Sequence, residues 1–248
     1  MIPVMVVPVL HYYEKLQTML DTVDHPIGHA IVIDNGGQCP DLYCDWIDRI
    51  TILRMPSNLG VPTSWNLGIQ LEPWAPYWLM SQDDITWIPG GLARIEEQSG
   101  PDILTMDMAG PRPFSSYTVG AQVVQQVGLF DESYYPIGGD DLNYHKRCHW
   151  AEIEERDISG TFVAEQSATI QHLVTSRTGS PAVIILNMER ALRTSVACEG
   201  WTLTRRRRNG RTNTTTEISE RLLHMLASDY RVHNPTEEQW MRVTRPTS

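Results

Sequence analysis

The sequence predicts an α/β fold with a Rossmann-like, mostly parallel sheet flanked by helices. Short buried apolar runs alternate with segments of helical apolar spacing over residues 4–81. This rhythm favours parallel strands joined by right-handed crossovers. Polar side chains follow three of the strands, namely Asp34, Asn58 and Asp84. Ligands bind at that edge of such a sheet, so we expect a site there.

Each element has its own signal. Four runs, 4–10, 30–33, 51–53 and 77–81, are apolar enough for buried strands. Residues 13–23 repeat apolar side chains at helical spacing, and a second helix is expected near 62–70. Neither GxGxxG nor GxxxxGK[ST] is present, which argues against a dinucleotide fingerprint and a Walker loop.

Charge divides the chain in two. Twelve of the twenty basic residues, all Arg, lie from Arg177 onward with seven of the thirty acids, so that part carries +5 and the rest −15. An N-terminal part this acidic should repel nucleic acid. The run Arg205–Arg208 could meet an acidic partner or anionic lipid, or lie solvated in a loop.

The hydropathy of the chain and the spacing of its cysteines predict its cellular compartment. No apolar run reaches bilayer-spanning length, and the first ten residues lack a basic segment, so we expect a soluble protein without a targeting signal or transmembrane segment. The cysteines show no metal-binding spacing and are expected to be free thiols in a reducing cytoplasm: Cys39, Cys44, Cys148 and Cys198.

Two pairs of adjacent acids stand out. Asp83 and Asp84 end an apolar run, and carboxylates there can share Mg²⁺ or Mn²⁺ with substrate phosphates or simply lie solvated in a turn. Asp140 and Asp141 follow two glycines and open an expected helix. One acid could cap that helix, but a cap does not account for both, which favours catalysis.

These motifs, taken together, resemble family 2 glycosyltransferases of the GT-A fold, the nucleotide-diphospho-sugar transferases. The resemblance covers roughly residues 3–176 in the family's order. Its pieces are Val-Val-Pro-Val with Pro8, Ile31–Gly36, Asn58–Gly60 with Trp65–Ile69, Gln82–Asp84, and Val127–Glu132 leading to Gly139–Asn143.

The resemblance implies a donor pocket. Asp34 matches the acid that contacts the donor's base or ribose, and Pro8, Asn58, Asn66 and Asp83 match nucleotide-binding positions. Asp84 matches the metal-holding acid of a D-x-D motif, although Gln82 replaces the first acid and leaves the number of carboxylate ligands open. His172 matches a histidine that several members place on the metal, for which imidazole would favour manganese.

The resemblance also implies a mechanism. Asp141 matches the catalytic base of inverting transfer, and Asp140 would hold an acceptor hydroxyl. At most one tryptophan is expected to stack on a sugar, and Trp87 lies nearest to the acidic turn. The expected activity is metal-dependent, inverting, hexosyl-type transfer from a nucleotide-diphospho-sugar to a saccharide or protein acceptor.

The sequence also leaves two alternative functions open and predicts a domain boundary. A sugar-1-phosphate nucleotidyltransferase would need a basic, Gly-rich loop after the first strand, and a non-catalytic carbohydrate-binding relative would be expected to lose one acid pair. The catalytic domain is expected over residues 1–178. A helical, Arg-rich extension is expected over 179–248, with helices near 182–196 and 218–230 that could cover the acceptor site or pair two copies of the chain.

Overall fold

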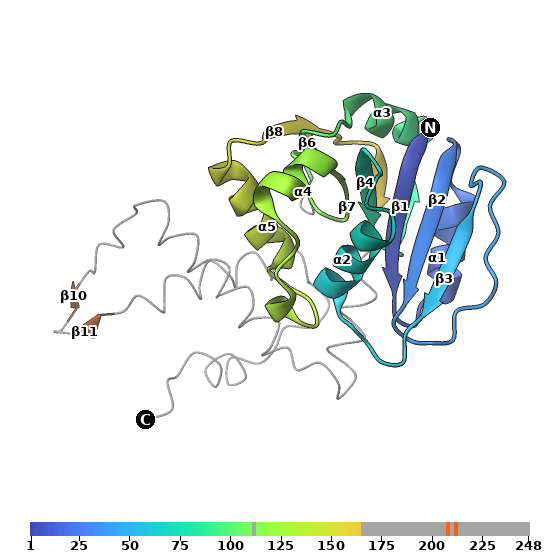
Figure 1. Ribbon diagram of the computed structural model, residues 1–248, viewed down its shortest axis with the longest axis horizontal. Helices are drawn as coiled ribbons and strands as arrows, with labels where there is room; N and C mark the ends of the chain where they lie inside the picture. Colours follow the sequence, from blue (N-terminus) through green and yellow to red (C-terminus); the bar gives the residue numbers. More distant parts are fainter. Residues whose placement is uncertain (111–112, 165–206, 209–210, 213–248) are drawn as a thin grey trace.

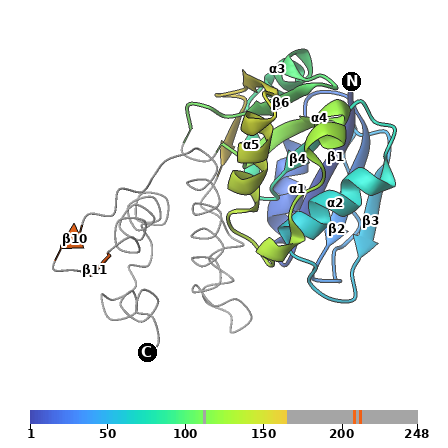
Figure 2. The same ribbon diagram turned by 60° about the vertical axis from the view of Figure 1, so that its left-hand side comes forward.

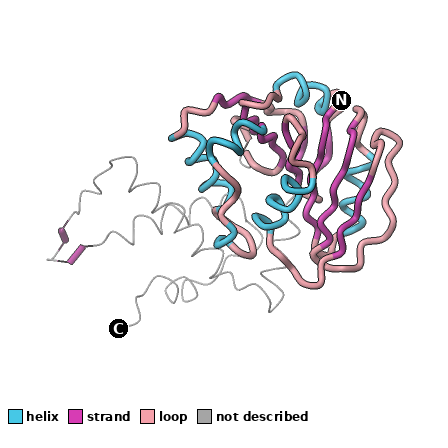
Figure 3. The backbone as a smooth tube through the Cα atoms, viewed as in Figure 1, coloured by secondary structure: helices cyan, strands magenta, loops and turns pink. Residues whose placement is uncertain are grey.

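The computed structural model describes residues 1–110, 113–164, 207–208 and 211–212. Its centre is a seven-stranded sheet in the order β3-β2-β1-β4-β7-β6-β8, visible as the magenta strands of Figure 3. The strands are β1 (Ile2–Val9), β2 (Ile27–Asp34), β3 (Ile50–Arg54), β4 (Tyr77–Ser81), β6 (Ile103–Met106), β7 (Ser116–Gly120) and β8 (Glu154–Asp157).

The sheet is mostly parallel. The pairs β1–β2, β2–β3, β1–β4 and β6–β8 are parallel, whereas β7 runs antiparallel to both β4 and β6. Consequently the carboxyl ends of β1, β2, β3 and β4 lie at one edge, beside the amino end of β7. The predicted fold class is confirmed.

Helices cover both faces of the sheet (Figures 1 and 2). They are α1 (Tyr13–Asp21), α2 (Val61–Leu71), α3 (Gly91–Gln98), α4 (Ala121–Val127), α5 (Asp140–Trp150) and the short η1 (Glu132–Tyr134). A small antiparallel pair, β5 (Ile85–Trp87) with β9 (Phe162–Ala164), lies apart from the main sheet. A second short pair joins β10 (Arg207–Arg208) to β11 (Arg211–Thr212).

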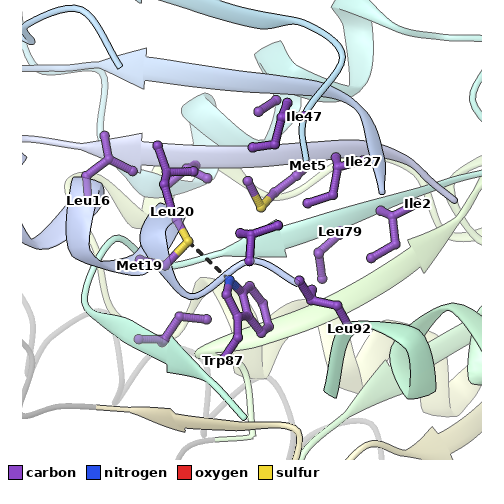
Figure 4. Packing of buried hydrophobic residues seen from close by; sticks show 14 of the residues in the cluster. Ile2, Met5, Leu16, Met19, Leu20, Ile27, Ile47, Leu79, Trp87 and Leu92 are labelled. Atoms are coloured by element: carbon purple, nitrogen blue, oxygen red, sulfur yellow. Dashed lines mark hydrogen bonds between the residues drawn. The ribbon is translucent and has the colours of Figure 1, made fainter. Parts of the chain in front are cut away.

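Two hydrophobic clusters hold these layers together. One packs α1, α3 and the β5–β9 pair against one face of the sheet, and the other packs α2, α4 and α5 against the opposite face. Figure 4 shows the first cluster around Met5, Met19 and Leu79. Alternate residues of β1 serve the two clusters, because neighbouring side chains of a strand point to opposite faces.

Trp87 belongs to the first cluster, which corrects the expectation that it stacks on a sugar. Its side chain is buried, and its Nε1–H donates to Met19 Sδ at 3.3 Å (Figure 4). Its ring also meets Phe162 edge to face, with 6.2 Å between centroids. The alternation along β5 turns this ring inward, away from the acidic turn that precedes it.

The four predicted strands and two predicted helices are confirmed, and so is the helix that begins at Asp140. Cys39, Cys44 and Cys148 form no disulfide among the described residues. No described helix is both long and apolar enough to span a bilayer. Cys198 and the helices expected near 182–196 and 218–230 lie outside the described residues.

Candidate active site

A pocket opens at the carboxyl ends of β1, β2 and β4. The space between its walls measures about 560 Å³ when the adjoining open solvent is included. Its walls come from the β1–α1 loop, the segment after β2, the start of α2, the turn after β4 and the loop before α5. The lining residues are Pro8, Val9, Leu10, Asn35, Asn58, Gly60, Val61, Trp65, Gln82, Asp83, Asp84, Pro136 and Ile137.

Pro8 explains why the sheet opens here. Pairing between β1 and β4 ends at Val6 with Met80, two residues before Pro8. Val9 directs its carbonyl toward β2, where it accepts from Asn35 N–H at 2.8 Å, so the adjacent Pro8 presents its backbone toward β4. Proline has no N–H and cannot continue that ladder. The two strands therefore separate, and the pocket lies between their ends.

Asp34 lies beneath the pocket wall and is not among the lining residues. Its carboxylate is fully buried and accepts four hydrogen bonds: from Tyr13 Oη at 2.9 Å and from the backbone N–H groups of Gly36, Gly37 and Cys39 at 3.1, 2.8 and 2.8 Å. These bonds fold the segment after β2 into a tight turn. Asp34 thus shapes this part of the wall through the turn it anchors.

Asn35, which the sequence reasoning did not single out, lines the pocket instead. Its Nδ2 donates to Ser64 Oγ at 3.0 Å, and its Oδ1 accepts from Leu59 N–H at 2.9 Å. It therefore ties the end of β2 to the loop before α2. The signal in the sequence was the position of Asn35 directly after β2, at the edge of the sheet where ligands bind.

Asn58 and Gly60 form the wall between β3 and α2. Asn58 lines the pocket, and its Oδ1 accepts from Gly60 N–H at 2.8 Å. Its Nδ2 is the part of the amide that does not take part in this bond. Gly60 has φ +81°, and a Cβ there would come within 2.8 Å of Pro136 O. Val61 N–H donates to that same carbonyl at 2.8 Å. This contact holds the loop before α5, including Ile137, against the pocket.

Asn66 lies outside the pocket and acts as an internal clamp. Its side chain is buried; its Oδ1 accepts from Phe130 N–H at 2.9 Å, and its Nδ2 donates to Phe130 O at 3.0 Å and to Glu132 Oε1 at 2.8 Å. Trp65, its neighbour on α2, lines the pocket, and no other tryptophan of the described residues does.

The acidic turn after β4 supplies the pocket's charge. Asp83 and Asp84 are both buried, with 3% and 4% of their surface exposed, and Gln82 N–H is fixed by Ser115 O at 2.9 Å. Burial raises the pKa of Asp83 to about 8, and the charge of Asp84 adds to this, while Lys15 acts in the opposite direction. Asp83 Oδ2 is buried without a hydrogen-bond partner among the described residues.

This turn fits a hard divalent cation. Two adjacent buried carboxylates, one with an unsatisfied oxygen, are a donor set that Mg²⁺ and Mn²⁺ accept when substrate phosphates and water complete the shell. Within the described residues, no group of three or more His, Cys, Asp or Glu side chains gathers to hold a metal without such help. His172, the expected further ligand, lies outside the described residues.

The second acid pair begins α5, directly after the pocket wall. Asp140 is buried and its Oδ1 accepts from Gly138 N–H at 3.0 Å, while Asp141 Oδ1 accepts from Leu142 N–H at 2.7 Å. Gly139, in a left-handed conformation, occupies the N-cap, so neither acid caps the helix by side chain. Neither acid is therefore the N-cap residue, although Asp141 satisfies the N–H of Leu142 in the first turn of α5.

Their environment disfavours ionisation. Burial raises the pKa of Asp140 to about 7, with the charge of Asp141 adding to it. Desolvation also raises the pKa of Asp141; backbone hydrogen bonds, first that from Leu142 N–H, oppose this shift, and His145 opposes it to a smaller extent. Tyr117 of β7 faces this pair, and burial together with Asp140 and Asp141 raises the pKa of its phenol well above the usual range. Perturbed acids beside a pocket are typical of catalytic sites.

Comparison with known proteins agrees with this architecture. No protein-family profile and no curated protein matches the chain. Among solved structures, S. aureus TarS 1-349 in complex with UDP-GlcNAc is 12% identical, with a TM-score of 0.55, covering 98% of this chain and 79% of that one. TarS 1-349 in another crystal structure is 13% identical, with a TM-score of 0.52 and the same coverage.

The catalytic domain of Drosophila beta1,4-galactosyltransferase 7, in complex with xylobiose, is 15% identical with a TM-score of 0.47, covering 66% of this chain and 70% of that one. At such identities the likeness to TarS establishes the fold. The chain therefore belongs to the α/β proteins with a GT-A-type sheet. More particularly, it shares the fold of S. aureus TarS 1-349.

Proposed function

We propose that the chain is a metal-dependent, inverting glycosyltransferase that moves a hexosyl group from a nucleotide-diphospho-sugar to an acceptor hydroxyl. The observation that carries the proposal is a GT-A fold with two pairs of adjacent acids: Asp83–Asp84, buried in the lining of the pocket, and Asp140–Asp141, at the start of α5 just after the pocket wall. TarS of the same fold was crystallised with UDP-GlcNAc, which supports a nucleotide sugar as donor.

The proposed roles follow from position. Asn35, Asn58 and Trp65 would contact the nucleotide from the pocket wall, through amide hydrogen bonds and an aromatic face. Asp84, with Asp83 and His172, would hold Mn²⁺ or Mg²⁺. When bound, that ion would offset the charge that grows on the departing diphosphate.

Asp141 is proposed as the base. Inverting transfer requires a carboxylate that removes the acceptor's proton opposite the leaving group. Asp140, the adjacent buried acid, has a pKa of about 7 and can therefore hold a proton and donate a hydrogen bond to an acceptor oxygen. The acceptor is proposed to be a saccharide or a protein hydroxyl.

Calorimetry tests the donor site. We expect UDP to bind with Mn²⁺ and to lose affinity at least about tenfold with EDTA or in Asp84→Ala, since a charge-assisted contact of roughly 1.5–3 kcal/mol is removed. Asp48→Ala is the matched control, because Asp48 is exposed and lies beside the amino end of β2, at the opposite edge of the sheet. Equal affinity in all these samples would exclude the metal-assisted donor site.

A second assay separates an enzyme from a binding protein. Nucleotide-sugar binding together with donor hydrolysis or transfer would support the enzyme. Tight binding with neither activity, across a panel of acceptors, would favour a carbohydrate-binding protein built on the same fold.

A further inference from the structure

A third group of titratable side chains lies behind the Asp140–Asp141 pair. His145 is on α5, one helical turn after Asp141, so the two side chains share a face of the helix. Its Nε2 lies 3.0 Å from Oε1 of Glu155, on the edge strand β8. Both atoms are shielded from solvent and neither makes a directed hydrogen bond within the described residues. Their contact is therefore electrostatic in character.

Aromatic packing fixes the imidazole in this position. The ring of Phe114 lies 5.5 Å from that of His145, and 5.1 Å from that of Tyr117 on the other side. His145 is thus held between a carboxylate on β8, an aromatic ring in front of β7, and Asp141 one turn earlier on its own helix.

His145 differs from the other titratable groups around Asp141 in the sign of the charge it can carry. Asp140 on α5 disfavours a second negative charge here, because its carboxylate lies beside that of Asp141. Glu155 on β8 adds another acid on the far side of the imidazole. Of these described groups, His145 is the one whose side chain can carry a positive charge.

We propose that His145, held by Glu155, is a positioning residue that keeps the Asp141 carboxylate ionised, so that it can take the acceptor's proton. The inference rests on the proposed function for its consequence in catalysis. Glu155 supports this role, because its carboxylate oxygen lies 3.0 Å from Nε2 and holds the imidazole in place. The arrangement would supply the base with a fixed counter-charge that is separate from the metal-binding turn.

Carboxyl NMR tests the charge coupling without requiring activity. In chains with ¹³C-labelled Asp carboxyls, the Asp141 signal is assigned by its loss in Asp141→Asn. We expect His145→Gln to raise the pH midpoint of that signal by on the order of half a pH unit, the size of a helix-turn ion pair strengthened by partial burial. His145→Lys should keep the midpoint near that of the wild type, because it restores the charge.

His149→Gln is the matched control, because His149 is exposed one turn further along α5. In this variant the pH midpoint of the Asp141 signal should stay at the wild-type value. An unchanged midpoint in His145→Gln, or equal shifts in the two variants, would overturn the proposal. If His145→Gln fails to fold, His145→Asn provides the same neutral comparison.

The pH profile of transfer connects the coupling to catalysis. In His145→Gln the acid limb of kcat/KM should move to higher pH by the same amount, while UDP affinity stays within about twofold of the wild type. A uniform loss of rate at all pH values would indicate a structural role instead. Absence of UDP binding in the wild type would refute the proposed function, and the NMR titration would still decide whether His145 controls Asp141.

Discussion

The two acid pairs should respond differently to neutral substitution. Asp141→Asn keeps the shape but removes the basicity, so turnover should fall by roughly 10²-fold or more while donor affinity changes little. Asp84→Asn should weaken donor binding as well as turnover, because it removes the charge of a proposed metal ligand. Calorimetry and transfer or hydrolysis rates measure the two effects. Full activity in Asp141→Asn would move the role of the base to Asp140.

Asp140 should also make the free energy of unfolding depend on pH. Its pKa is raised to about 7 in the folded chain, so the folded state binds a proton more tightly than the unfolded state does. The free energy of unfolding should therefore decrease as pH rises from about 4 to about 7, and level off above that.

Asp140→Asn removes this titration. The variant's melting temperature should depend less on pH between 5 and 8 than that of the wild type, and should exceed it most at pH 8. Asp83, with a pKa of about 8, contributes the same trend to both chains and cancels in the comparison. Parallel curves for the two proteins would contradict this account.

At the scale of elements, Asn66 joins α2 to the segment between α4 and α5. Asn66→Ala would leave the buried backbone N–H and C=O of Phe130 unpaired, which costs about 1–3 kcal/mol. The melting temperature should fall by several degrees. Gln70→Ala, at an exposed position of the same helix, is the control and should have little effect. If both variants melt alike, Asn66 is not the clamp that its contacts indicate.

The elements that the sequence predicted are those with a strong apolar signal. β1, β2 and β4 are buried runs of Val, Ile and Met, and α1 repeats apolar side chains at helical spacing. β7 was not predicted, because its buried residues include Ser116 and Thr118. Thr118 shares a hydrogen bond of 2.9 Å with Thr105 on β6, so the two strands satisfy hydroxyls inside the core. Hydropathy cannot reveal such a pair.

The same limit applies to the site. The acid pairs were recognisable because adjacent carboxylates after an apolar run or two glycines are unusual. Asp34 accepts hydrogen bonds from its own turn, whereas Asn35 lines the pocket. This difference depends on the direction of the two side chains. The wall formed by Pro136 depends on a contact with Gly60 that joins distant parts of the chain. Only the folded structure shows these relations.

For the whole molecule, a chain ending at residue 178 should fold. The two described hydrophobic clusters are built from residues between Ile2 and Ala164, and the seven-stranded sheet is complete by Asp157. We expect residues 1–178 to unfold in one cooperative transition, with the near-ultraviolet circular dichroism of a packed core. A broad, non-cooperative transition would place part of the core-forming chain beyond that boundary.

The proline at the end of β1 has a consequence for what can enter the molecule. Where β1 and β4 separate, the centre of the sheet has an internal strand edge, and exposed strand edges capture extended peptides by backbone pairing. Pro8 removes the donor that such capture would need on the β4 side. The opening is thereby protected against foreign strands, and it remains accessible to a ligand that binds through its own polar groups.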